Sequence, residues 1–210
     1  MIQIKLIGDW QKAARIVDTM GPRWEKAQQI AVEREAHFLR RQMVQNLTSG
    51  GALAGKPFAP LGQGTLVVRA FRGFGGTKPL IVTGALRNSI SVVKAPMSGG
   101  TVVFVGVRRG AGMKGGKDKA NIAEIHEFGA NFTVRMTAKM RRFLAAAYRR
   151  AGVPFGRGGG GKGTGVLQIR IPARPFIGPV IDKFAKPDDV QKRFWTTVSA
   201  LMGYDLGRPG

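Results

Sequence analysis

The residues with the most potential for chemistry are a histidine and two carboxylates in one short run. His126 stands between Glu124 and Glu127. A metal centre would need further ligands, and the other histidine of the chain, His37, falls on a distant predicted helix. The H-E-x-x-H spacing of zinc proteases is absent, because Ala130 occupies the position of the second histidine. We therefore predict a role in structure or subunit contact for this cluster, and no catalytic residue, cofactor site or metal site.

A glycine-rich run at residues 156–163 comes close to the phosphate-binding pattern G-x-x-x-x-G-K-[ST]. Gly163 stands where that pattern needs a hydroxyl group for magnesium. The run also leads from a predicted helix to a predicted strand, whereas phosphate-binding loops lead from a strand to a helix. The composition instead predicts a flexible polar loop.

Positive charge dominates the chain, with 34 basic and 12 acidic residues and a net charge of +22. No acidic residue occurs between Glu127 and Asp182. Two basic, glycine-rich loops, at about 108–118 and 152–165, are predicted to be flexible and to lie outside the core. Their cations are expected to contact either phosphates or an acidic protein surface, since charge identifies the sign of a partner and not its class. These cations are Arg108, Arg109, Lys114, Lys117, Arg157 and Lys162.

The totals favour one globular domain over residues 1–210. A hydrophobic content of 43% is enough for a substantial core. No apolar run approaches the roughly 18 residues of a membrane span, and the first residues do not have the pattern of a secretory signal. The chain has no cysteine, so it forms no disulfide, which fits a cytosolic origin.

Hydrophobic periodicity predicts the N-terminal elements. A strand is expected over residues 2–7, followed by a helix over 10–19 that Gly21-Pro22 closes. The longest helix then runs from about Pro22 to Thr48. Its main apolar stripe is expected to cover a sheet. A weaker line on the opposite side is either a lateral subunit contact or a tolerant surface, and it consists of Ile30, His37 and Val44.

The later elements are shorter. Thr83 can cap a short helix starting at Gly84, and Gly129 is expected to end another short helix that carries His126. Further expected elements are a hairpin over about 90–107, a strand over 132–136, a helix over 137–151, a strand over 166–171 and a helix over 187–202. This order predicts an α+β fold: a mostly antiparallel small sheet flanked by the long N-terminal helix and further helices, with the two glycine-rich basic loops.

Three sequence blocks, in order, resemble a known family. They are the "KPLIVTGALRNSI" block at 78–90, the "IAEIHEFG" block at 122–129 and the "IPARPF" block at 171–176. With a hairpin that ends in a Val-Gly step between the first two, the chain resembles the phage virion-morphogenesis (tail-completion) family of Mu-like phages over about residues 25–200. The two basic loops are longer than the core of that family needs.

The resemblance implies a structural virion protein of the phage neck or tail and not an enzyme. It implies a homo-oligomeric ring of six copies that closes the tail tube and joins it to the head connector, with phage DNA in the lumen, bound without sequence specificity. Such a subunit is assembled in the host cytoplasm. His126, Glu127 and Arg174 would then serve subunit contacts. The alternative hypothesis is a sequence-independent nucleic-acid-binding module.

Overall fold

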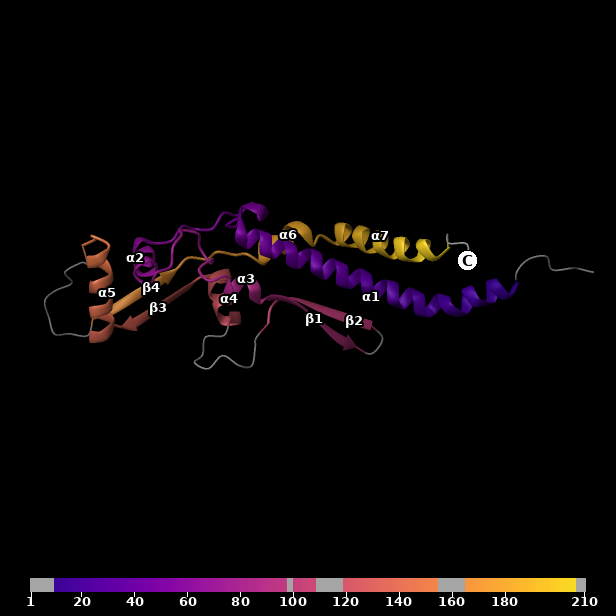
Figure 1. Cartoon of the computed structure of the whole chain (residues 1–210), viewed down its shortest axis with the longest axis horizontal. Coiled ribbons are helices and arrows are strands. Elements are labelled where there is room, and N and C mark those ends of the chain that lie inside the picture. Colours follow the sequence, from indigo (N-terminus) through magenta and orange to yellow (C-terminus); the bar gives the residue numbers. More distant parts are fainter. Residues whose placement is uncertain (1–9, 98–99, 109–118, 155–164, 207–210) are drawn as a thin grey trace, which may run out of the picture.

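The computed structural model describes residues 10–97, 100–108, 119–154 and 165–206. The strand expected over 2–7 lies outside the described residues. The same holds for five of the six loop cations: Arg109, Lys114, Lys117, Arg157 and Lys162. The molecule is elongated, and one long helix runs along much of its length (Figure 1).

That helix is α1, Trp10–Thr48, with Pro22 inside it. The break expected at Gly21-Pro22 is therefore wrong, because one helix of 39 residues replaces two. Proline in a helix interior removes one hydrogen bond and costs about 3 kcal/mol, but it does not forbid the helix. At about 1.5 Å per residue α1 is roughly 58 Å long, long enough to serve as the backbone of the molecule.

The strands form two separate antiparallel sheets of two strands each. β1, Ile90–Met97, pairs with β2, Gly100–Val107. β3, Ala130–Arg135, pairs with β4, Val166–Ile171. The α+β class is confirmed, but the described strands do not join into the single sheet that the sequence suggested. Alternation of side chains specifies which face of a strand is buried, and not which strand lies beside it.

Six shorter helices complete the described chain. They are α2 (Gln63–Phe71), α3 (Ala85–Ser89), α4 (Lys119–Phe128), α5 (Ala138–Arg150), α6 (Gly178–Phe184) and α7 (Pro187–Leu206), with a 3-10 turn at Ala52–Ala54. Local signals located several of them. Thr137 accepts a hydrogen bond from the Met140 N–H at 3.2 Å and caps α5, and Gly129 follows α4 with φ +77°.

The core consists of two clusters along α1. The larger one gathers Met43, Leu47, Leu86, Ile90, Ala123, Phe176 and Val180. It therefore joins the end of α1 to residues from all three sequence blocks. The smaller one packs Ala27 and Ala31 of α1 against Val198 of α7. The apolar stripe of α1 thus covers α7 as well as the β1–β2 hairpin.

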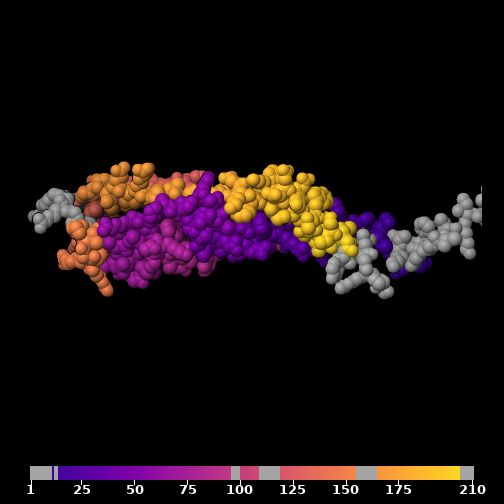
Figure 2. All heavy atoms as spheres, turned by 90° about the horizontal axis from the view of Figure 1, so that it is seen from above, coloured from indigo at the N-terminus to yellow at the C-terminus, as the bar shows by residue number. Residues whose placement is uncertain are grey.

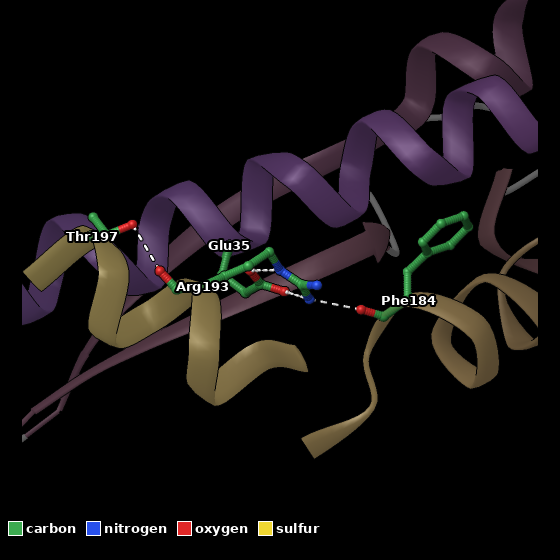
Figure 3. A network of polar contacts seen from close by, with 4 residues as sticks. All are labelled: Glu35, Phe184, Arg193 and Thr197. Carbon is green, nitrogen blue, oxygen red and sulfur yellow. Dashed lines mark hydrogen bonds and ion pairs between the residues drawn. The ribbon is translucent and has the colours of Figure 1, made fainter. Parts of the chain in front are cut away.

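An ion pair fixes α7 along α1 (Figure 3). The Arg193 Nε donates to the Glu35 carboxylate at 2.8 Å, and an Nη donates to the Phe184 carbonyl at 2.7 Å. The same guanidinium group lies 4.5 Å from the centre of the Phe38 ring. One arginine therefore ties α1, the end of α6 and α7 together. Seen from above, α7 (yellow) lies in one half of the molecule, and the orange segment around β4 lies toward the opposite end (Figure 2).

Candidate functional site

Glu127, at the end of α4, holds the start of α6. Its carboxylate accepts hydrogen bonds from the backbone N–H groups of Phe176 at 2.9 Å, Ile177 at 3.1 Å and Gly178 at 2.7 Å. Backbone N–H groups in the first turn of a helix have no partner within the helix, and the helix dipole favours a negative charge there. Glu127 therefore caps α6 from another element, 51 residues away in sequence from Gly178.

Arg174 connects the same region to a third segment. Its backbone N–H donates to the His126 carbonyl at 2.6 Å. Its side chain is buried and donates to the carbonyls of Ala59 at 2.7 Å and Pro60 at 2.9 Å. Burial lowers the pKa of the guanidinium group from its usual value. The arginine of the third block thus clamps the loop before α2 against the end of α4.

His126 is half-buried beside these two residues. Burial lowers the pKa of its imidazole from 6.5, and the positive charge of Arg174 adds to this effect. Both effects favour the neutral form of the imidazole. Its Nδ1 has no hydrogen-bond partner within the described part of the chain. Among the described residues, no three histidine, cysteine or carboxylate side chains lie close enough to hold a metal ion.

The structure thus brings His126, Glu127 and Arg174 together, and the contacts just described lie within one chain. Their role in subunit contact stays a prediction. Of the loop cations, Arg108 is the one described. It is exposed directly after β2 and lines a pocket with Phe104 and Ala120.

A second buried arginine escaped the sequence analysis. Arg69 of α2 is 8% exposed and donates to the carbonyls of Lys78 at 2.9 Å, Gly75 at 3.3 Å and Ile81 at 2.9 Å. It therefore holds the glycine-rich segment that follows α2 in a closed loop. The sequence signal is that Arg69 follows the apolar run 66–68 and precedes the glycine-rich residues 73–76.

Four elements lie together at one end of the molecule (Figure 1), and we name them the end lobe: α2, β3, α5 and β4. The rings of Phe71 in α2 and Phe143 in α5 pack edge to face with centroids 5.4 Å apart. No acidic residue occurs between Glu35 and Asp118 or between Glu127 and Asp182, so the lobe has no carboxylate side chain of its own. The exposed arginines and lysines of this lobe therefore give it a field of a single sign.

Apolar side chains are exposed at several places. Val102 and Phe104 on the outer face of the β1–β2 hairpin are each 48% exposed. Phe128 at the end of α4 is 78% exposed, and Val166 of β4 is 67% exposed. Large apolar side chains that gather on strand faces are typical of surfaces that contact other chains.

Comparisons with known proteins give no relative: no protein-family model, no curated protein and no solved structure matches this chain. No helix in the described ranges combines the length and apolar character that crossing a membrane requires.

Proposed function

We propose that the chain is a structural virion protein of the phage neck or tail: a tail-completion or tail-terminator subunit. In this proposal several copies, six by the resemblance, form a ring that joins the tail tube to the head connector around the DNA channel. The protein acts by geometry and charge and not by catalysis. It is assembled in the host cytoplasm and ends in the virion.

The observation that carries the proposal is the convergence of the three sequence blocks. Leu86 and Ile90 of the first, Ala123 of the second and Phe176 of the third belong to one buried cluster. The polar residues of the second and third blocks bond to backbone groups that join α4, α6 and the loop before α2. The blocks that carry the resemblance therefore act as one scaffold, as expected if they define a common fold and not a reaction centre.

The open architecture also supports an assembly role. A two-stranded sheet needs further packing to be stable in water, and this chain has two such sheets among its described strands. Both sheets carry exposed apolar side chains, for example Phe104 and Val166. Neighbouring chains in a ring would cover such faces and supply the missing burial.

The net charge of +22 suits a channel for DNA. Lysine and arginine contact phosphates without reading the base sequence. In a ring, the cations of one subunit are multiplied by the copy number, so a modest number per chain creates a strong field around the lumen.

The second candidate function is a sequence-independent nucleic-acid-binding module that acts outside the virion. The specific observation in its favour is the same charge, concentrated on an end lobe without carboxylates. The two candidates differ in where the protein is found: in purified particles for the first, and on cellular nucleic acid for the second.

The test is a nonsense mutation in the gene, in the phage or prophage that encodes it, with electron microscopy of the lysate. We expect filled heads and separate tails, and infectious particles restored by the wild-type gene supplied on a plasmid. Joined, infectious particles at the wild-type yield without the protein would contradict the proposal.

A further inference from the structure

We propose that a groove in the end lobe binds an extended acidic segment of a partner protein, which adds as a third strand to the free edge of β4. This inference deepens the proposed assembly role by naming the chemistry of one partner. The inference depends on the proposed assembly role in one respect: it takes the partner to be a protein.

The groove lies between α2, α5 and β4 and has a volume of about 610 Å³. Its wall is mainly apolar, with Val68 from α2, Leu144 from α5, and Leu167 and Ile169 from β4. Pockets of about 300–1,000 Å³ with a mainly apolar lining are typical of binding sites. The space therefore suits a few residues of a peptide.

The edge of β4 borders this groove. Four consecutive residues, 167–170, line it. Successive side chains of a strand point to opposite faces, so consecutive residues border one groove when the strand turns its edge toward it. β4 pairs with β3 along its other edge, and no backbone hydrogen bond joins Val166–Ile171 to any further described element. An extended peptide can form the missing ladder there.

The positive charge around the groove indicates that its occupant is negatively charged. Arg72 and Arg170 line it, and the end lobe has no carboxylate to neutralise them. The guanidinium carbon of Arg72 lies 5.4 Å from the centre of the Phe143 ring, a cation–π contact that restricts where this charge can lie. Arginine forms charge-assisted hydrogen bonds with carboxylates. A strand that alternates acidic and apolar residues therefore fits both the two arginines and the apolar wall.

A nucleic acid fits this groove less well than a peptide. Double-stranded DNA is bound mainly through its phosphates and gains little from an apolar wall. The strand edge offers N–H and C=O groups in the alternating order that another strand satisfies.

The experiment measures binding by fluorescence anisotropy with the purified full-length protein at about 0.15 M salt. The probe is a labelled peptide of about ten residues in which glutamate alternates with valine. A second peptide has the same composition, with all valines before all glutamates. A third probe is a labelled DNA duplex of about 20 base pairs. We expect the alternating peptide to bind at least about tenfold more tightly than the block peptide.

Two double variants of equal charge separate the groove from the general field. Arg72→Gln with Arg170→Gln removes two positive charges that line the groove. Arg142→Gln with Arg149→Gln removes two exposed charges of α5 that do not line the groove. We expect the Arg72/Arg170 variant to bind the alternating peptide at least about tenfold more weakly than the wild type. The affinity of the Arg142/Arg149 variant should stay within about threefold of the wild-type value. Melting temperatures establish that both variants are folded.

Hydrogen exchange gives an independent readout. The bound alternating peptide should slow the exchange of backbone amides in residues 166–171, because a new strand would accept hydrogen bonds from that edge. Equal binding of the two peptides, or equal losses in the two double variants, would overturn the proposal in favour of general attraction to a basic surface. Binding of the duplex in the groove, weakened specifically by the Arg72 and Arg170 changes, would overturn it in favour of nucleic acid. None of these outcomes depends on whether heads and tails join, so the inference and the proposed function can fail separately.

Discussion

The side chain of Glu127 connects the second sequence block to the third. One carboxylate satisfies three backbone N–H groups at the start of α6. A glutamine at this position would keep one oxygen acceptor, lose the charge and place an NH₂ group against a backbone donor. A single residue thus fixes how α4 and α6 meet.

The first prediction follows from this contact. Glu127→Gln should lower the free energy of unfolding by about 2 kcal/mol, since hydrogen bonds to charged groups are the stronger ones. Urea unfolding followed by circular dichroism measures the change. Glu25→Gln, a control on the exposed surface of α1, should change the unfolding midpoint little. Equal midpoints for the two variants would show that Glu127 is not a structural cap.

The second prediction concerns pH. The pKa of His126 is lowered in the folded protein by burial and then by Arg174, so below pH 6.5 the unfolded chain binds more protons than the folded one. The contribution of this histidine to the free energy of unfolding is greatest above pH 6.5. It is lost as the pH falls from 6.5 toward the lowered pKa. His126→Gln should therefore reduce the fall in unfolding midpoint between about pH 7 and pH 5.

His37→Gln, on the exposed side of α1, is the matched histidine replacement and should change the unfolding midpoint at pH 7 little. If His126→Gln left the pH dependence of the unfolding midpoint unchanged, protonation of this imidazole would not be coupled to folding. Hydrolase activity that vanishes in the His126 variant would overturn the proposal of a structural protein.

At the scale of elements, the turn after α4 depends on a glycine for two reasons. Gly129 has φ +77°, and a Cβ there would lie 3.0 Å from the Ala173 nitrogen and 3.0 Å from the Ile171 oxygen. Gly152, after α5, also has positive φ, but a Cβ there would meet nothing within 4 Å. The two positions share the backbone strain, and the close approach occurs only at Gly129.

The third prediction compares these two glycines. Gly152→Ala should cost about 1 kcal/mol from the left-handed conformation alone. Gly129→Ala should cost a further amount of about 1–3 kcal/mol, because backbone atoms must move. Chemical denaturation of both variants measures the difference. Equal costs would mean that the segment carrying Arg174 does not pack against the end of α4.

The sequence predicted well those elements whose signals are local. The strand at 166–171 follows from alternation and agrees with β4 residue for residue. The start of α5 follows from Thr137, whose hydroxyl oxygen caps it. In both cases the residues that fix the boundary lie next to the element.

The sequence failed where distant residues decide. The helix α6 begins with Gly178-Pro179 and owes its cap to Glu127, so no local pattern marked it. The continuity of α1 through Pro22 and the separation of the strands into two sheets also depend on the packing of distant segments. The candidate site was found as three sequence blocks, but the contacts between them required coordinates.

At the scale of the whole molecule, positive charge and uncovered surface act in opposite directions. Exposed apolar side chains such as Phe104 and Phe128 favour association. A net charge of +22 opposes the packing of like subunits until an anionic partner or salt compensates it.

The fourth prediction is that the isolated protein associates weakly. Light scattering at moderate salt should find mainly monomers or small species, and the mean mass should rise when salt or a polyanion is added, since screening removes the repulsion. A stable ring at micromolar concentration without partners would contradict this balance of forces.

The most direct test of the account is a cryo-electron microscopy reconstruction of the phage particle that we propose contains this chain. We expect density for the chain in a ring between head and tail, with α1 recognisable as a rod of roughly 58 Å and with basic surface facing the DNA. A particle whose neck and tail are fully accounted for by other proteins, with this chain absent, would contradict the central claim.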